Sequence, residues 1–348
     1  MNEQWSGVRL GLPSKGPLGE TTISLLEQAG LNVVRPSLRQ YVATIPALPG
    51  LTVLFQRPGD LVTSVREGSL DYCITGLDVF YEKMTPQDPV FPIHKALGYG
   101  YCTLNLIVPE ALGKINRVED LISWQKSLNR PLHVATKFPN LTRSFLLDHG
   151  VSDFALIHAE GTLEIATTIG SADMIADLVS SGTTLRENRL KKLTDGQILA
   201  SQACLIANKN NLKAKPEALN TARLLVEYIV AYLRASECVS IFVNMRGESP
   251  ESIAKLMFTQ PLLSGLQGPT ISPVIPMNRP DQWFAAHLVA RKANLNEVIA
   301  ELRQIGGSGV VVSPVNYIFE EEPEEIRQMI AVLEENPCPG TPQSAPIS

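Results

Sequence analysis

The residues best suited to chemistry lie in one stretch, 173–185. An apolar segment there carries two carboxylates, Asp173 and Asp177, and is followed by serines and threonines around Gly182. Glycine lets backbone N–H groups approach an anion closely, hydroxyls donate to phosphate oxygens, and a helix that begins after the loop favours negative charge. We therefore predict a site for a phosphorylated sugar, in which Asp177, nearer the loop, accepts hydrogen bonds from ribose hydroxyls. A strand followed by a Ser/Thr-capped helix, with no ligand, explains the same local pattern.

Composition narrows the class of protein. The 348 residues carry a formal net charge of −5, and this acidic balance argues against a nucleic-acid partner while still allowing anionic small substrates. The five cysteines lack metal-ligand spacing, so we expect reduced thiols rather than a zinc site or a disulfide framework. No stretch approaches the ~20 apolar residues of a membrane span, and the first residues do not resemble a signal peptide. We expect a cytoplasmic protein without a membrane partner, or else a mature plastid form.

Strands that alternate with amphipathic helices occupy the first part of the chain. This order predicts α/β architecture in two lobes with a cleft between them, and such clefts are the usual small-molecule sites. We place the first lobe at 1–100 with a return segment at about 200–225, and the second, which carries the loop, at 101–199. The predicted strands are 8–12, 52–56, 72–75, 104–108, 131–135, 155–157 and 174–179, and the apolar run 198–206 is expected to cross back to the first lobe.

The pattern changes near residue 213, where a long helix begins the last domain. Ser249 and Pro250 suit the N-cap and first position of a helix, and Asn294 with Glu297 resembles a capping box. We predict a ferredoxin-like (ACT-like) α+β domain of βαβ–βαβ order at 226–325, followed by a tail at 326–348. The expected helices are 216–234 and 251–258, and the expected strands are 239–243, 283–290 and 310–312.

A longer set of positions extends the pattern around the loop, and several further segments are also distinctive. The positions are Glu164, Gly170, Ala172, Ile175, Asp177, Leu178, Ser181, Gly182, Thr184 and Leu185; the segments are 12–16, 55–58, 68–71, 74–76, 134–140, 201–205, 265–273 and 306–309, with 244–247 and 312–315. At every spacing, the positions resemble the signature of ATP phosphoribosyltransferases. The segments resemble the same family, including the C-terminal regulatory domain of its long form, and 244–247 and 312–315 resemble plant-type members. One departure is Pro17, where many members have Arg, so we assign no cation role to that position.

The resemblance implies a two-lobed core like that of periplasmic binding proteins, and a defined reaction. N1 of the adenine ring of ATP attacks C1 of the ribosyl ring of phosphoribosyl pyrophosphate, and pyrophosphate leaves, as the first step of L-histidine biosynthesis. Mg²⁺ is expected on the pyrophosphate with mostly water and phosphate ligands, so no metal cage from the protein is expected. Catalysis is then mainly positioning and electrostatic stabilisation.

The family's roles are carried over position by position, and each has a plainer alternative. Lys15 and Arg57 could be solvated loop cations, Asp71 a turn residue, and Glu164 a charge at a helix N-terminus. The assignments are Ser181, Gly182, Thr183, Thr184 and Leu185 for the 5′-phosphate; Asp177, with Asp173 in support, for the ribose hydroxyls; Lys15, Gly16 and Arg57 for pyrophosphate or ATP phosphates; and Asp71 and Glu164 as polar contacts in the cleft to nucleotide or ribose.

For the last domain the resemblance implies feedback inhibition by L-histidine and a homo-oligomer, from dimer to hexamer. A Gly-rich turn offers N–H groups to a carboxylate, although a tight helix-to-strand connection explains the same glycines. The candidate histidine contacts are Asn244, Thr270, Ser272, Gly307, Ser308 and Gly309.

Two other functions fit part of the pattern. A purine or pyrimidine salvage phosphoribosyltransferase would share the phosphate loop, but two lobes with an additional sandwich domain argue against it. A two-lobed binding protein without catalysis would share the order of elements, but the acid-and-hydroxyl loop argues against it. Pyrophosphate release with ATP as the acceptor separates these possibilities.

Overall fold

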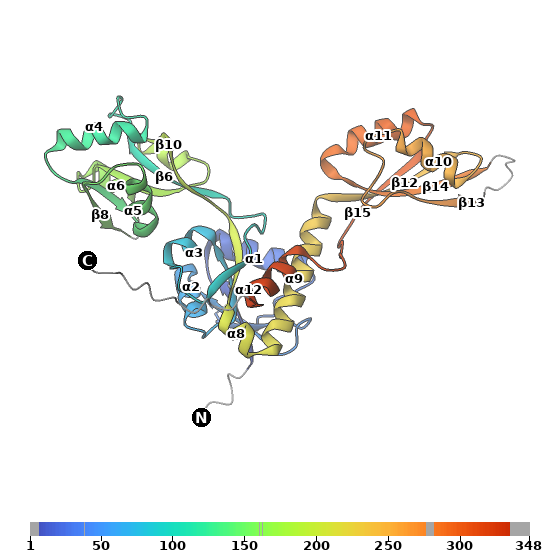
Figure 1. The fold of residues 1–348 in the computed structure, drawn as a ribbon, viewed down its shortest axis with the longest axis horizontal. Coiled ribbons are helices and arrows are strands. Elements are labelled where there is room, and N and C mark those ends of the chain that lie inside the picture. The colour runs from blue at the N-terminus through green and yellow to red at the C-terminus, as the bar shows by residue number, and fades with distance from the viewer. Residues whose placement is uncertain (1–6, 38, 160, 162, 276–281, 335–348) are drawn as a thin grey trace, which may run out of the picture. The chain divides into compact units, whose positions relative to one another are not determined.

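The computed structural model describes residues 7–37, 39–159, 161, 163–275 and 282–334. They fall into two compact units, one formed by the chain up to Val226 together with the residues from Glu324 onward, and one formed by Glu227–Pro323. The first unit contains the two lobes expected from the sequence, each built on its own sheet (Figure 1).

The first lobe has a sheet of six strands in the order β2-β3-β1-β4-β11-β5. β1 pairs in parallel with β3 and β4, whereas β11 runs antiparallel to both β4 and β5. The chain therefore leaves this lobe after β5 and returns with β11, which confirms the expected crossing back. The strands are β1 (Val8–Pro13), β2 (Val42–Thr44), β3 (Leu51–Gln56), β4 (Tyr72–Gly76), β5 (Val90–His94) and β11 (Ala203–Asn208); the helices are α1 (Gly16–Gln28), α2 (Pro58–Arg66), α3 (Leu77–Lys83), α8 (Lys209–Ala214) and the start of α9 (Pro216–Ser236).

The second lobe has a sheet of five strands in the order β10-β6-β9-β7-β8. β7, β8 and β9 are parallel, so their carboxyl ends lie at one edge, where the following loops gather. The strands are β6 (Cys102–Pro109), β7 (Leu132–Thr136), β8 (Phe154–His158), β9 (Met174–Val179) and β10 (Leu190–Ser201); the helices are α4 (Val118–Leu128), α5 (Pro139–Asp148), α6 (Leu163–Thr168) and α7 (Thr183–Glu187).

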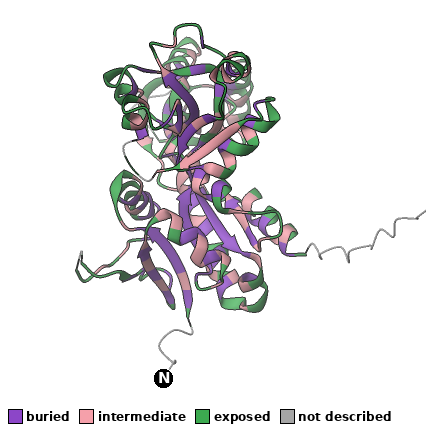
Figure 2. Cartoon of the chain, turned by 90° about the vertical axis from the view of Figure 1, so that its left-hand side faces the viewer, coloured by how far each residue is buried: buried purple, intermediate pink, exposed green. Residues whose placement is uncertain are grey.

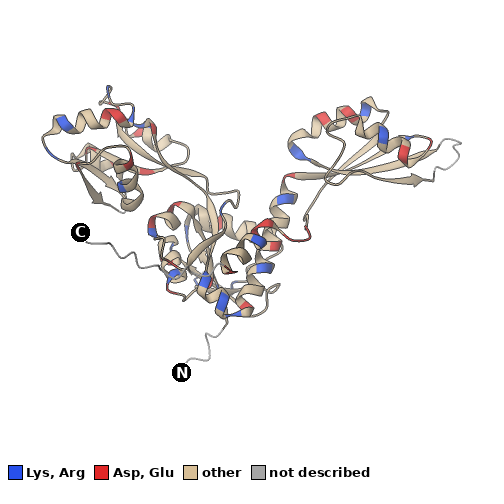
Figure 3. Ribbon diagram, in the orientation of Figure 1, with Lys and Arg blue, Asp and Glu red and all other residues tan. Residues whose placement is uncertain are grey.

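The central strands of each sheet form the interior of the two lobes because most of their side chains are apolar and buried, as in β4, β11 and β6, whereas β10 is half exposed. Figure 2 shows these strands largely buried and the outward helix faces exposed. Acidic and basic residues are distributed over the helices of both lobes (Figure 3). Proline marks several helix starts, since its fixed φ and missing N–H suit the first turn; α2 and α5 begin at Pro58 and Pro139.

The second unit is a ferredoxin-like sandwich, as predicted. Its four antiparallel strands follow the order β13-β14-β12-β15, and its connectivity is βαββαβ. Alternate residues of β12, including Ile241 and Val243, pack with Ile253 and Leu302 of the helices in one apolar core. The elements are β12 (Cys238–Arg246), α10 (Pro250–Phe258), β13 (Thr270–Val274), β14 (Trp283–Arg291), a 3-10 turn at Lys292–Asn294, α11 (Leu295–Gln304) and β15 (Ser308–Pro314).

Three details correct or confirm the expectations for this part of the chain. Ser249 accepts a hydrogen bond from the Ser252 amide at 3.2 Å, which confirms the N-cap of α10. The capping box at Asn294 was wrong, because Asn294 lies in the 3-10 turn and makes no side-chain cap. The tail assigned to 326–348 was wrong in its first part: Glu324–Glu334 form α12, which packs on β5 and α8 of the first unit through Ile326, Met329 and Leu333.

Candidate active site

The loop after β9 has the form expected from the sequence. Gly182 has φ 72°, in the left-handed region that glycine adopts without strain, and α7 begins directly after it. Leu185 is buried in the apolar cluster that contains Ile175 and Val179, so it anchors the loop by packing and only its backbone faces the turn. The predicted strand, Gly-containing loop and helix are therefore confirmed as local structure.

The hydroxyl groups of this loop are exposed and already oriented by one another. The Ser181 hydroxyl donates to Thr183 Oγ1 at 3.1 Å, and the Thr183 amide donates to Ser181 Oγ at 3.4 Å. Arg186 Nη2 donates to Thr183 Oγ1 at 3.2 Å, which places a guanidinium beside the loop. Sequence reasoning did not single out Arg186, although its position one turn into the helix after the loop was a usable signal.

Asp177 lies at the carboxyl end of β9, on the same sheet face as Val179. Its Oδ1 accepts a hydrogen bond from the Leu178 amide at 2.8 Å. Burial raises the pKa of the Asp177 carboxyl, and the nearby Glu164 carboxylate raises this pKa further, while the Leu178 amide and Lys137 oppose the rise. Glu164 and Lys137, which follows the neighbouring strand β7, are therefore near enough to Asp177 to affect its charge.

Asp173 does not belong to this group, which corrects the supporting role given to it. It precedes β9, and a strand rises about 3.3 Å per residue, so Asp173 and the loop lie at opposite ends of the strand. Both its carboxylate oxygens accept from the Arg130 guanidinium, at 2.7 and 2.6 Å, and the His133 amide donates to Oδ2 at 2.9 Å. Burial alone would raise the pKa of Asp173, but these bonds outweigh it and lower the pKa.

Asp71 is also a structural residue rather than a cleft residue. It is 0% exposed and stands before β4, at the edge opposite the carboxyl ends of the parallel strands. Its carboxylate accepts from the Arg9 amide at 2.8 Å, from Asn211 Nδ2 at 2.8 Å and from Lys215 Nζ at 2.9 Å. A fully buried and bonded carboxylate of this kind ties β1, β4 and α8 together, which corrects its assignment to the nucleotide.

Lys15, Gly16 and Arg57 stand at one edge of the first sheet. β1 and β3 are parallel and in register up to Pro13 and Gln56, and Lys15 and Arg57 occupy the N-cap positions of the helices that follow. Both cations are exposed, and Gly16 has φ 78° with open space where a Cβ would lie. Their placement together agrees with the expectation, and their role as phosphate contacts stays a prediction.

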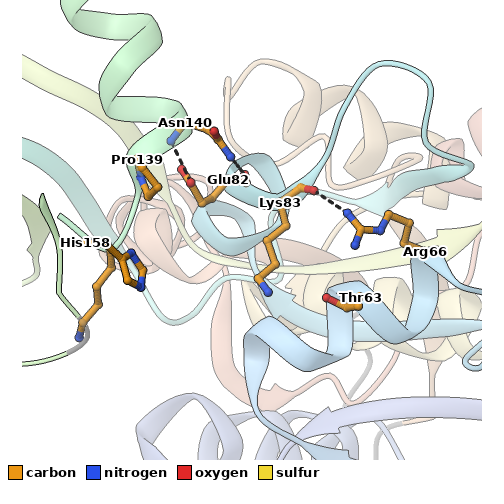
Figure 4. A pocket seen from close by; sticks show the side chains of 8 residues that line it. Thr63, Arg66, Glu82, Lys83, Pro139, Asn140 and His158 are labelled. Atoms are coloured by element: carbon orange, nitrogen blue, oxygen red, sulfur yellow. Dashed lines mark hydrogen bonds between the residues drawn. The ribbon is translucent and has the colours of Figure 1, made fainter. Parts of the chain in front are cut away.

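A cavity of about 310 Å³, which the sequence did not reveal, lies between the two lobes. Figure 4 shows Thr63, Arg66, Glu82 and Lys83 of the first lobe facing Pro139, Asn140 and His158 of the second. Lys137 completes the lining. Arg66, Lys83 and Lys137 give the lining three cations, while the Glu82 carboxylate accepts hydrogen bonds from the Asn140 and Leu141 amides.

The candidate histidine contacts lie in the second unit and share one sheet face. The alternation along β12 and β13 puts Asn244, Thr270 and Ser272 on the face away from the helices, because Val243 and Ile271 pack on the core. Asn244 pairs with Ser308, whose hydroxyl donates to the Asn244 carbonyl at 3.3 Å. β14 separates these residues from β13, so Thr270 and Ser272 are two strands away from Asn244.

Gly307 has a packing reason for being glycine. A Cβ there would approach the Leu302 carbonyl oxygen to 2.6 Å, so the tight connection from α11 to β15 requires it. Gly309 has φ 59°, and a Cβ there would meet Asn244 Nδ2 at 3.3 Å. The plainer alternative is therefore sufficient for Gly307.

The described residues include no helix long and apolar enough to cross a membrane. Within the same part of the chain, no group of three or more His, Cys, Asp or Glu residues is placed to hold a metal ion.

Comparison with known proteins identifies the family. The profile described as "ATP phosphoribosyltransferase" (HisG) matches residues 57–231, and "HisG, C-terminal domain" matches residues 235–317. The chain is 41% identical to "ATP phosphoribosyltransferase 2, chloroplastic" of Arabidopsis thaliana, over 94% of this chain and 80% of that protein. It is 30% identical to ATP phosphoribosyltransferase of Nitrobacter hamburgensis, over 90% of this chain and 94% of that protein.

A solved structure is similar in fold. The ATP phosphoribosyl transferase (HisG:HisZ) complex from Thermotoga maritima has a TM-score of 0.51 and 25% sequence identity, over 64% of this chain and 97% of that chain. The relatives named ATP phosphoribosyltransferase are pentosyltransferases, and the two-lobed α/β unit, the ferredoxin-like unit and the hydroxyl-rich loop of this chain fit that class. The chain belongs to the ATP phosphoribosyltransferase family, whose reaction is the first step of histidine biosynthesis.

Proposed function

We propose that this chain transfers the phosphoribosyl group of phosphoribosyl pyrophosphate to N1 of ATP, giving phosphoribosyl-ATP and pyrophosphate, and that the loop 181–185 binds the 5′-phosphate. The main support for this proposal is the geometry of that loop. The hydroxyls of Ser181 and Thr183 are exposed, Gly182 has a left-handed backbone, and the Arg186 guanidinium lies 3.2 Å from Thr183 Oγ1. Backbone and hydroxyl donors beside a cation suit a phosphate dianion.

Asp177 is proposed to hold the ribose and to stabilise the reacting centre. Its carboxylate accepts hydrogen bonds from the ribose hydroxyls, and its negative charge favours the positive charge that develops at C1 as pyrophosphate departs. Burial strengthens this interaction because the local dielectric is lower than in water. Glu164 and Lys137, both close enough to shift the pKa of Asp177, set the charge of this part of the cleft.

The cavity between the lobes is proposed to receive phosphate groups of ATP or the departing pyrophosphate. Arg66, Lys83 and Lys137 converge on it from both lobes. Lys15, Gly16 and Arg57 lie at the edge of the first sheet and are proposed as further contacts to these groups. Cations held in place before the reaction stabilise a leaving group without reorganising.

Mg²⁺ is proposed to enter with the pyrophosphate, where it neutralises charge on the leaving group. Magnesium sites commonly use one or two carboxylates with water and substrate phosphates. Asp177 and the nearby Glu164 are the carboxylates beside the loop that could take part in such a site.

Three further properties are proposed on the family's pattern. Histidine inhibits through the sheet face of the second unit that carries Asn244, Thr270 and Ser272. The chain assembles as a homo-oligomer. It works in a plastid, in line with two relatives from Arabidopsis thaliana that are named chloroplastic.

The test is pyrophosphate release from the full chain with ATP, phosphoribosyl pyrophosphate and Mg²⁺, repeated with free adenine in place of ATP and with added L-histidine. We expect release that requires ATP and falls as histidine is added. Release with adenine but not ATP, or no release at all, would overturn the proposed reaction, and release that is indifferent to histidine would overturn the proposed regulation.

A further inference from the structure

Helix α3 of the first lobe carries two buried carboxylates on one face. Asp78 and Glu82 are four residues apart, so they project from the same side of the helix. Asp78 is 5% exposed and Glu82 is 8% exposed. Carboxylates are rarely buried to this degree unless they have specific partners. The partners of Glu82 lie on α5 of the second lobe, and the partner of Asp78 is the last residue of β10.

Glu82 supplies a helix cap that α5 cannot supply for itself. The first N–H groups of a helix have no partner within the helix, and Phe138, at the N-cap of α5, has no side-chain acceptor. Glu82 Oε1 accepts from the Asn140 amide at 2.9 Å, and Oε2 accepts from the Leu141 amide at 3.0 Å. In return, Asn140 Nδ2 donates to the Glu82 carbonyl oxygen at 2.9 Å (Figure 4).

Asp78 holds the other end of α3 to the point where the chain passes between the lobes. The Ser201 hydroxyl donates to Asp78 Oδ1 at 2.6 Å, and the Asp78 amide donates to Ser201 Oγ at 2.9 Å. Ser201 is the last residue of β10 and pairs with Cys102, the first residue of β6. The two strands that connect the lobes, β6 and β10, therefore pair beside Asp78. Glu82 forms its hydrogen bonds to the second lobe at a separate place, the start of α5.

We propose that Glu82 is a positioning residue, which caps α5 across the lobe boundary and so keeps the two lobes at the separation that forms the anionic-ligand cavity. Residues from both lobes line that cavity, and Glu82, Asn140 and Pro139 are among them. Asp78 and Glu82 bind the second lobe at two separate places, so we expect the lobes to reorient more freely when the Glu82 contact is lost. The inference rests on the proposed function, because the cavity matters to catalysis only if substrates use it.

The alternative is that Glu82 only stabilises the fold. The two roles predict different kinetics. If the lobe orientation that binds substrate becomes a minor state, the apparent affinity for substrate falls in proportion to the populated fraction of that state. Saturating substrate then restores the binding orientation, so kcat is kept. A role in fold stability alone would reduce the amount of active enzyme, and hence the apparent kcat, with KM unchanged.

The experiment compares the full chain with Glu82→Ala, Glu82→Gln and the matched control Glu67→Gln, whose exposed carboxylate lies at the end of α2 in the same lobe. We expect Glu82→Ala to raise the KM of both ATP and phosphoribosyl pyrophosphate by about tenfold, the usual effect of losing charge-assisted bonds, with kcat within about twofold. Glu82→Gln keeps one acceptor and should lie between Ala and the parent. The control should match the parent.

Amide hydrogen exchange provides a measurement that does not depend on activity. Exchange at the Asn140 and Leu141 amides should be faster in Glu82→Ala, while the strands of both sheets keep their protection. Unchanged exchange there, or an unchanged KM in an active variant, would overturn the proposal. If Glu82→Ala does not fold, Glu82→Gln carries the same test. If the parent itself releases no pyrophosphate, the proposed function fails, and the exchange measurement alone then decides whether Glu82 caps α5.

Discussion

Replacing Gly182 by alanine tests the phosphate loop directly. Gly182 has φ 72°, and a Cβ added there would lie 3.8 Å from Arg186 and 3.9 Å from Val179. The side chain therefore meets no steric clash within the protein, and the cost to folding is the left-handed backbone alone, about 1–2 kcal/mol. For a unit of this size, that corresponds to a fall in Tm of about 2–8 °C.

The cost to function has a different origin. The added methyl group would occupy the space through which a phosphate approaches the loop amides. Loss of charge-assisted hydrogen bonds to an anion typically costs about 1.5–3 kcal/mol, so we expect KM for phosphoribosyl pyrophosphate to rise about tenfold or more. The KM of ATP should change less, since the loop is assigned to the sugar phosphate.

Gly170→Ala is the matched control, because Gly170 has φ 73° in the same lobe with open space around its ideal Cβ. It should lose comparable stability and keep its kinetics. Gly182→Asn should regain part of the stability, since Asn tolerates the left-handed region, but not the affinity. Calorimetry and steady-state pyrophosphate release measure both effects. Equal KM values for phosphoribosyl pyrophosphate in Gly182→Ala and Gly170→Ala would refute the assignment of the loop.

The remaining predictions concern charge and regulation. Asp177→Asn should abolish turnover without lowering thermal stability at neutral pH. Folding raises the pKa of Asp177, so the stability that this carboxyl contributes is present at low pH and is lost as pH rises through the folded pKa. A variant that stays active contradicts the ribose role. Asp173→Asn should lower Tm and leave kcat unchanged. Because the pKa of Asp173 is lowered on folding, its contribution to the free energy of unfolding is present at neutral pH and is lost as pH falls through the folded pKa. The Tm values of parent and variant should therefore converge when thermal unfolding is measured at low pH. Thr270→Ala should weaken histidine inhibition about tenfold with kcat retained, and identical inhibition curves would exclude Thr270 from the histidine site.

The parts of the site that the sequence revealed are those formed by neighbours along the chain. The loop 181–185 is such a case, since its strand, glycine, hydroxyls and helix are consecutive, and its local structure was predicted. The alternating pattern of β12 and β14 gave the ferredoxin-like order for the same reason. β13 was not predicted as a strand, because its five residues include Pro273 and most of its side chains are exposed.

The errors involve partners that are distant in sequence. Asp71 looked like a cleft residue, but its partners Asn211 and Lys215 follow about 140 residues later. Asp173 looked like a second acid of the loop because it shares a strand with Asp177, although its bond to Arg130 places it at the other end. Glu82 carries no sequence signal, since its role depends on how α3 of one lobe meets α5 of the other.

The returning strand β11 also affects how the protein is made. It lies between β4 and β5 in the finished sheet, although more than a hundred residues separate it from either in synthesis order. A ribosome therefore completes the whole second lobe before the middle of the first can close. Until then the edges of β4 and β5 carry unpaired backbone groups, so the nascent chain has a defined interval in which chaperones are most needed. Pulse-labelled folding of chains stalled before and after residue 208 would show this interval directly.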